Sequence, residues 1–193
     1  MILVRRICKA QLSTANRSMI YKRTFFGLSS HEGKEQKYVL TRTINAPALN
    51  VYDVISEVSK YHEFIPYCVE SFVEKRNLKT GKPEEAGLRV GFQQYDERFL
   101  CKVNCVSNPK GIKTVVAESL THGLFDVLYT KWTVERHPTR ANASQVELLL
   151  KFQFKSRLYN SVASLFAKSV TQLVMKAFER RVFQVSKGVI KAQ

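Results

Sequence analysis

The chain has few acidic side chains and no long apolar run. Its 193 residues include 16 Asp and Glu against 31 Lys and Arg, which gives a formal net charge of +15. No window of about 18 apolar residues occurs, so we expect no transmembrane helix and only peripheral contact with a membrane. Apolar content of 45% and charged content of 24% are ordinary for a globular protein, and the length suffices for one domain with its own core.

Residue patterns of metal sites and common hydrolases are also missing. The four histidines are scattered, no HExxH spacing occurs, and there is no GxSxG or phosphate-binding glycine loop. Cys101 and Cys105 lie four residues apart on a predicted strand, about 13 Å from each other and too far to bridge. We therefore expect reduced thiols, with Cys68 isolated, and we expect no metal, no cofactor and no catalytic residue.

The first 30 residues carry six basic and no acidic side chains, many hydroxyls and spaced apolar residues. This composition is typical of a mitochondrial transit peptide, with an ordinary disordered tail as the alternative. We expect a transit peptide over residues 1–30, a linker over 31–36 and a folded domain over 37–190. The remaining net charge of +9 implies attraction to a polyanion, and without a recognisable RNA-binding motif an anionic membrane surface is favoured.

Period-two alternation of apolar and polar residues dominates the middle of the chain. Residues 37–45 predict a strand, and Pro47 begins a helix that should stop near Tyr61. Several strands follow, with a polar loop predicted from Asn77 to Gly87. Residues 146–154 give the clearest alternation, which indicates an antiparallel sheet with one apolar face.

The C-terminal stretch from Ser156 to Lys187 contains no Pro or Gly and predicts a helix of roughly 45 Å. Its apolar arc is wider than the stripe of about 100° that one packing face requires. The predicted order is therefore strand, helices, about six strands and one long helix, an α+β fold in which a curved sheet wraps the last helix. The natural cavity lies between the sheet and that helix.

Four segments carry a family resemblance: NAPALNVYDVISEVSKYHEFIPYC, AGLRVGFQQYDERFLCKV, LFDVLYTKWTV and VELLLKFQFKSRLYNSVASLFAKSV. The chain resembles the mitochondrial coenzyme Q-binding proteins of the START, or polyketide-cyclase-like, superfamily from about Tyr38 to the end of the long helix. The resemblance implies a helix-grip fold with about six to seven strands and a tunnel that holds ubiquinone or a related isoprenoid lipid. It also implies a lipid chaperone at the matrix face of the inner membrane that supports respiration and coenzyme Q biosynthesis without catalysing a reaction. Respiratory or biosynthetic complexes are possible partners, and no nucleic acid is expected.

An elongated apolar tunnel suits a polyprenyl tail, because burial contributes about 25 cal/mol per Å² of apolar area. The alternative for each residue is that it simply fills a dry core. The residues expected to line the tunnel are Phe64, Pro66, Leu88, Val90, Phe92, Phe99, Val103, Leu128, Trp132, Leu150, Phe152, Phe154, Val162, Phe166, Val170 and Leu173. The residues expected to form a gate or to contact the membrane, in two apolar turns, are Ile65, Tyr67, Leu124 and Phe125.

Two other functions stay open. A cyclase-like or hydrolase-like enzyme acting on an aromatic precursor would need a polar cavity residue, for which Glu118, His122 and Asp126 are candidates, although outer-face carboxylates are usually solvated. A ribosome-associated or RNA-binding protein would account for the basic charge, and its binding should weaken steeply with salt.

Overall fold

The computed structural model describes residues 35–92, 95–121, 123 and 125–190, without the side chains of Phe92, Tyr95 and residues 157–168. The predicted transit peptide, most of the predicted linker, His122 and Leu124 lie outside the described residues. The side chains of Phe92, Val162 and Phe166 do as well. Predictions that concern them stay predictions.

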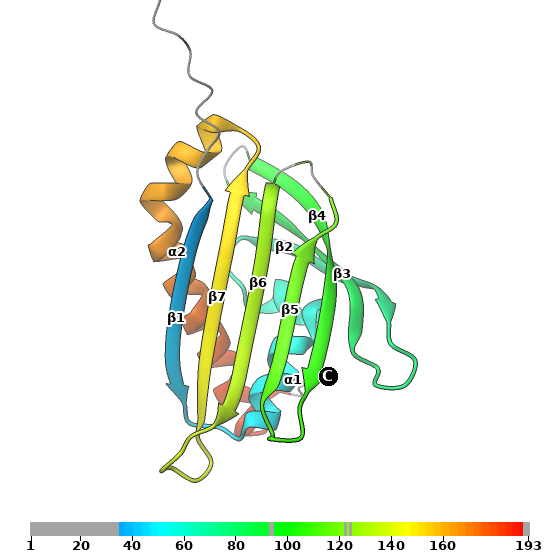
Figure 1. The fold of residues 1–193 in the computed structure, drawn as a ribbon, viewed down its shortest axis with the longest axis vertical. Helices are drawn as coiled ribbons and strands as arrows, with labels where there is room; N and C mark the ends of the chain where they lie inside the picture. Colours follow the sequence, from blue (N-terminus) through cyan, green and yellow to red (C-terminus); the bar gives the residue numbers. More distant parts are fainter. Residues whose placement is uncertain (1–34, 93–94, 122, 124, 191–193) are drawn as a thin grey trace, which may run out of the picture. The chain divides into compact units, whose positions relative to one another are not determined.

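Seven strands and two α-helices make up the described part of the chain (Figure 1). The first strand begins at Gln36, inside the predicted linker. In chain order the elements are β1 (Gln36–Ile44), α1 (Ala48–Ser56), the 3-10 helix η1 (Val58–Glu63), β2 (Cys68–Arg76), β3 (Pro83–Phe92), β4 (Tyr95–Ser107), β5 (Lys113–Ser119), β6 (Phe125–Arg136), β7 (Ser144–Phe154) and α2 (Arg157–Ser186).

The strands form one antiparallel sheet in the order β1-β7-β6-β5-β4-β3-β2. Strands β2 to β7 follow one another as a meander, and β1 closes the order by pairing with β7 at the other end of the chain. Both α-helices pack on the same face of the sheet (Figure 1). The predicted α+β fold, a curved antiparallel sheet around a long C-terminal helix, is confirmed.

A closed core fills the space between this face and the two helices. Val134 of β6 and Val146 of β7 are fully buried in one cluster with Val51 of α1 and Val182 of α2. Phe178 of α2 lies at its centre, with its ring centroid 4.7 Å from that of Trp132. We refer to this set of residues as the closed core.

The predicted single helix from Pro47 to Tyr61 is wrong, because it divides after Ser56. Glu57 has a ψ of 76°, which is not helical, and its carboxylate and the Ser56 hydroxyl bind side chains of the β2–β3 region instead. The helix resumes as η1, whose tighter turns are common in short connectors. Tertiary hydrogen bonds have here displaced a local helical preference.

The predicted loop from Asn77 to Gly87 is also too long, because β3 begins at Pro83. Proline is tolerated as the first residue of a strand, where its missing N–H disturbs no ladder bond. Gly87 lies inside β3. A larger residue would not fit there, because a Cβ would stand 2.5 Å from Phe99 O and closer still to the Phe72 ring. Its glycine therefore marks a close approach of neighbouring groups and not a turn.

An irregular register near the start of β6 changes which side chains face the helices. Leu128, Thr130 and Trp132 alternate regularly, but the pairing with β7 shifts between Phe125 and Val127. This one-residue shift turns Phe125 to the same face as Leu128. The prediction that Phe125 lies exposed in a turn is wrong, because it is the first residue of β6 and is buried.

Helix α2 buries a narrow stripe in its C-terminal half. Met175, Phe178 and Val182 follow the spacing of one helix face and are almost fully buried. Leu173 lies about 160° around the helix from Met175, by the 100° turn per residue, and is 40% exposed. The prediction that Leu173 closes the cavity is therefore wrong. Val170 is also exposed, and its predicted contact with the cavity stays a prediction.

Candidate functional site

A second group of apolar side chains occupies the other end of the same sheet face. Four of its members are buried and seven are partly buried, and they come from every strand except β2. We call this group the aromatic cluster; it consists of Phe99, Cys101, Phe125 and Phe152, with Tyr38, Leu88, Val90, Ala117, Leu128, Leu150 and Phe154.

Ring contacts connect the members of the aromatic cluster across four strands. Phe125 stacks on Phe154 at a centroid distance of 4.7 Å and meets Phe99 edge-on at 5.4 Å. Phe152 stands 5.4 Å from Phe154 and lies nearly parallel to Tyr38 at 6.0 Å. Such offset and edge-to-face pairs add stability beyond the area that they bury. They give the cluster a defined apolar surface.

Burial falls along β6 and β7 from the closed core to the aromatic cluster. Val134 of β6 and Val146 of β7 are 0% exposed, whereas Leu128, Leu150 and Phe154 on the same strands and the same face are only partly buried. Apolar side chains on the helix-facing side of a sheet are normally covered. The aromatic cluster therefore offers apolar area that a bound apolar molecule could cover.

The predicted tunnel residues divide between these two groups. Those in the aromatic cluster are Leu88, Val90, Phe99, Leu128, Leu150, Phe152 and Phe154. Phe64, Val103 and Trp132 belong to the closed core or pack against it, and Pro66 is partly buried in the turn before β2. Sequence reasoning missed Tyr38 and Ala117 as cluster members. Alternation with the exposed neighbours Lys37 and Val39 could have indicated Tyr38, whereas Ala117 follows the apolar Val116 and has no such signal.

The turn between η1 and β2 was predicted as a gate. Phe64 is partly buried and meets Phe178 edge-on at 5.2 Å, and Ile65 packs against the closed core. Tyr67 is 47% exposed, has a positive φ of 65° and accepts a hydrogen bond from Gly91 N at 2.9 Å. The first half of the turn is thus anchored by its apolar side chains, and the second half is exposed. A gating role for this turn stays a prediction.

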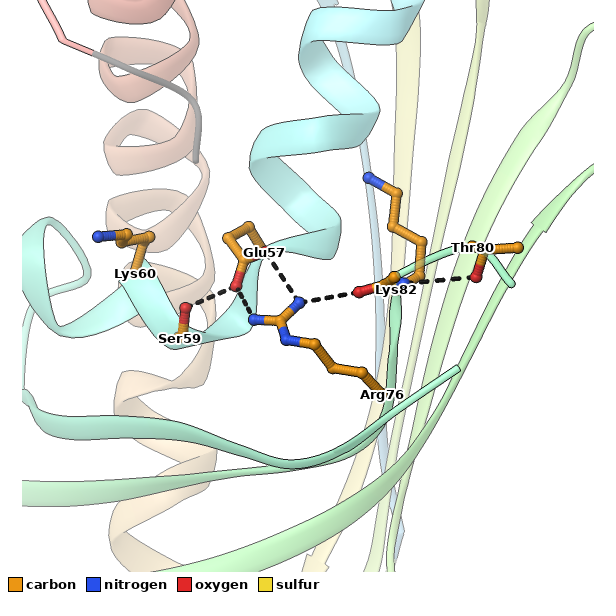
Figure 2. Close-up of a pocket in the computed structure, with 7 residues that line it drawn as sticks. Glu57, Ser59, Lys60, Arg76, Thr80 and Lys82 are labelled. Carbon is orange, nitrogen blue, oxygen red and sulfur yellow. Dashed lines mark hydrogen bonds and ion pairs between the residues drawn. The ribbon is translucent and has the colours of Figure 1, made fainter. Parts of the chain in front are cut away.

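A separate polar pocket of about 380 Å³ lies beside the junction of α1 and η1 (Figure 2). Arg76 donates hydrogen bonds of 2.7 and 3.1 Å to the Glu57 carboxylate and one of 3.0 Å to Gly81 O. Lys82 Nζ lies 2.7 Å from Asp53 Oδ1, and Lys60 pairs with Glu63. All three cations of this pocket have a carboxylate partner, so the pocket offers no unpaired positive charge to a ligand. The ion pairs of Arg76 and Lys82 connect the β2–β3 region to α1 and Glu57.

The Glu57 carboxyl shows which effect prevails in that pocket. Burial by itself would raise its pKa, but hydrogen bonds from Arg76 and Ser59 outweigh burial, and the pKa lies below its ordinary value of 4.5. A carboxyl with a lowered pKa stabilises the fold above its ordinary pKa, and this contribution disappears as the pH falls through the folded-state pKa.

We therefore expect Arg76→Ala to lower the free energy of unfolding by about 1 to 2 kcal/mol at neutral pH, since it leaves a nearly buried carboxylate without its main donor. The difference from the wild type should shrink below pH 4.5, where protonation removes the charge. Urea unfolding at several pH values measures both effects. Arg89→Ala is the matched control, because the Arg89–Asp96 pair is solvent-exposed. Equal losses for the two variants would contradict the prediction.

The cysteines of the described domain are free, as predicted. Burial raises the pKa of Cys101 to about 12 and that of Cys68 to about 11. Burial likewise raises the pKa of Cys105 to about 11. Thiols with such pKa values are poor nucleophiles at physiological pH. They serve as packing groups, and Cys101 does so within the aromatic cluster.

Two of the three polar residues considered for catalysis face away from the cluster, and the third, His122, lies outside the described residues. Glu118 lies on β5 between the inward-facing Ala117 and Ser119 and is exposed, and Asp126 at the β6 irregularity is exposed as well. Over the ranges that the structure describes, no group of three or more His, Cys, Asp or Glu side chains could hold a metal ion. No helix in the same ranges is long and apolar enough to cross a membrane.

The fold and the partly covered apolar face define a START-like protein. Residues 44–179 match the family described as polyketide cyclase / dehydrase and lipid transport. A START superfamily protein from Mycobacterium smegmatis has a TM-score of 0.65 at 17% identity, with 77% of this chain and 98% of that chain covered. The aromatase/cyclase Zhui from Streptomyces has a TM-score of 0.62 at 13% identity, with 82% and 98% covered. These solved structures support the fold alone.

Two fungal proteins are much more similar in sequence. The mitochondrial coenzyme Q-binding protein of Saccharomyces cerevisiae is 55% identical over 179 residues, which cover 92% of this chain and 86% of the relative. That of Eremothecium gossypii is 54% identical over 182 residues, which cover 94% and 89%. The chain belongs to the family of mitochondrial coenzyme Q-binding proteins. The resemblance that the sequence indicated is confirmed.

Proposed function

We propose that the chain binds coenzyme Q, or a related polyprenyl lipid, between the aromatic cluster and the N-terminal half of α2. The single observation that carries this proposal is the set of partly exposed apolar side chains on the helix-facing side of the sheet. The names of the fungal relatives support coenzyme Q as the ligand. Leu88, Leu128, Leu150 and Phe154 would contact it.

The binding energy would come from apolar burial. Each Å² of apolar surface removed from water contributes about 25 cal/mol, and a polyprenyl tail offers a large area without requiring polar partners. The partly buried rings of Tyr38 and Phe154, which stack on Phe152 and Phe125, would also present flat faces to a quinone ring. The cluster therefore suits a ligand that combines an aromatic-like head with an apolar tail.

The protein would act as a lipid chaperone that supports respiration and coenzyme Q biosynthesis, and not as an enzyme. Its relatives are named as binding proteins. The exposed positions of Glu118 and Asp126 also leave them unsuited to act on a molecule in the cluster. Residues 1–30 would act as a transit peptide and 37–190 as the lipid-binding domain, in agreement with the mitochondrial names of the relatives.

We further propose peripheral binding to the matrix side of the inner membrane. Tyr67, Val69 and Leu120 are exposed apolar residues near the strand ends that carry the aromatic cluster. Exposed apolar side chains enter the bilayer interface, while excess basic charge attracts anionic lipids. The lipid could then exchange with the bilayer close to the cluster.

Extraction of the purified full chain with organic solvent tests the proposal. Liquid chromatography with mass spectrometry should detect a polyprenyl quinone, at a molar ratio that approaches one per chain after incubation with ubiquinone-containing vesicles. A heat-denatured sample treated in the same way provides the background. Protein that neither carries nor takes up any polyprenyl lipid would rule out this function.

A further inference from the structure

Three segments that are distant in sequence form a groove of about 1190 Å³ at the end of the sheet opposite to the aromatic cluster. They are the start of α1 at Pro47–Leu49, the β4–β5 turn at 109–113 and the β6–β7 hairpin at 135–143. Figure 1 shows all three at the lower end of the sheet. Strand β6 separates the two ends by about 36 Å, at 3.3 Å per residue. We call this feature the basic groove.

Positive charge dominates the basic groove. Four cationic side chains line it, Lys110, Lys113, Arg136 and Arg140, against the single carboxylate of Glu135. Within the described ranges, neither Lys110 nor the two arginines take part in an ion pair. Helix α1 starts in the groove without a side-chain cap or an acidic residue in its first turn, so its dipole adds to the positive potential. This contrasts with the polar pocket, where each cation is paired.

The basic groove also has an apolar part. Leu49 is 55% exposed, and Ile112 and the exposed Pro109 and Pro138 line the groove with it. No Phe, Tyr or Trp side chain is among its lining residues, and the one imidazole, of His137, accepts hydrogen bonds within the hairpin through Nδ1. Aromatic platforms are what proteins use to stack the bases of single-stranded nucleic acids. The combination of cations with aliphatic side chains instead fits a peptide that carries both carboxylates and aliphatic residues.

Hydrogen bonds fix both turns that form the walls. Asn108 N and its side-chain oxygen bond to the backbone of Ile112 at 2.9 and 2.8 Å, and Gly111 has the positive φ that this turn requires. In the hairpin, His137 Nδ1 accepts hydrogen bonds from Thr139 N and Arg140 N. Ser144 Oγ donates to Ala46 O at 2.6 Å and so joins the hairpin to the start of α1. A site that is already ordered loses less entropy on binding.

We propose that the basic groove binds an acidic peptide segment of a partner protein that also carries aliphatic side chains. A second copy of this chain fits poorly, since a symmetric contact would bring like charges together. The chain's own first 30 residues contain no Asp or Glu and would be repelled. A bilayer that exchanged lipid with the aromatic cluster would lie at the other end of the sheet. That last point rests on the proposed function, whereas the charge and the lining of the groove do not.

Panning of phage-displayed random peptides on the full-length chain tests this proposal without a guess at the partner. We expect enrichment of peptides rich in Asp and Glu that also contain Leu or Ile. A labelled synthetic copy of the most enriched peptide should bind with an affinity that falls about tenfold or more in the R136E/R140E variant, because two attractions become repulsions. Leu49→Ser should weaken binding as well.

The matched control is the K37E/K79E variant, which makes the same change in net charge at two exposed lysines outside the groove. It should keep its affinity for the peptide, and thermal unfolding should show that all variants are folded. Enrichment without acidic residues, or equal loss in the control variant, would overturn the proposal. So would binding to phosphatidylcholine–cardiolipin vesicles or to poly-uridine RNA that depends on Arg136 and Arg140 while peptide binding does not. None of these outcomes depends on whether quinone is bound.

Discussion

Replacing Phe178 with alanine should destabilise the domain by about 4 kcal/mol, within the range for removing a large buried aromatic side chain. Phe178 is 2% exposed, and its ring lies within 5.2 Å of the rings of Tyr61, Phe64 and Trp132, measured between centroids. These rings come from η1, the following turn and β6, so the cavity left by the substitution would adjoin three elements. Because the free energy of unfolding of a domain is only about 5 to 15 kcal/mol, this loss would remove a large fraction of its stability.

Urea unfolding monitored by the fluorescence of the single tryptophan measures this loss. Phe183→Ala is the matched control on the same helix, because Phe183 is 59% exposed and its removal should change stability by about 0.5 kcal/mol or less. If the two variants unfolded at the same urea concentration, α2 would not be anchored by the ring contacts that the structure shows.

Replacing Leu150 with glutamine should remove most of the bound polyprenyl lipid while the domain stays folded. Leu150 is a partly buried member of the aromatic cluster, opposite Tyr38 on β1 and Thr130 on β6. A side-chain amide there would lose its hydrogen bonds to water when a lipid covered it, at a cost of about 1 to 3 kcal/mol. The amount of quinone recovered per chain should fall about tenfold or more, as measured by mass spectrometry of the extract.

Leu149→Gln provides a closely matched control for this prediction. Leu149 is the preceding residue on β7, is also partly buried, and points to the outer face, where it pairs with Val39 and Lys131. It should keep the wild-type amount of lipid. Equal retention of quinone by both variants would show that the ligand does not lie on the helix-facing side of the sheet. Comparison of thermal unfolding separates loss of lipid from loss of the fold.

The sheet could be predicted from the sequence because apolar and polar residues alternate clearly in β3, β4, β7 and most of β6. Val146, Leu148 and the following even-numbered residues of β7 all face the helices, as their spacing indicates. Seven members of the predicted tunnel therefore fall together in the aromatic cluster. Alternation shows which face of the sheet a side chain is on, but not whether a helix packs over it. The sequence therefore could not separate the closed core from the partly buried aromatic cluster.

Two residues were misplaced because a regular period was assumed. Phe125 lies just before a register shift that turns it to the inner face, and a one-residue irregularity leaves no clear trace in the apolar pattern. Leu173 was included because the apolar arc of α2 is wide, and only packing against the sheet shows which part of that arc is buried. In both cases, tertiary packing determines which face of the strand or helix is buried.

Neither the basic groove nor the Glu57–Arg76 pair could be predicted from the sequence. Arg136 and Leu49 are separated by most of the domain in the chain, and only the pairing of β6 with β7 and the position of α1 bring them to one end. Glu57 and Arg76 lie 19 residues apart in segments that were predicted as a helix and a strand. Sites built from loops or from single long-range contacts have no local pattern that could reveal them.

The pairing of β1 with β7 also determines when the domain can finish folding. Each strand from β2 to β7 meets its neighbour through a short connection, whereas Ala46 and Ser144, which join the end of β1 to the start of β7, lie 98 residues apart. Such distant pairing forms slowly because a long loop must close first. While the meander folds, β7 therefore exposes an unpaired edge until β1 docks, and this edge is where premature association with other chains would begin.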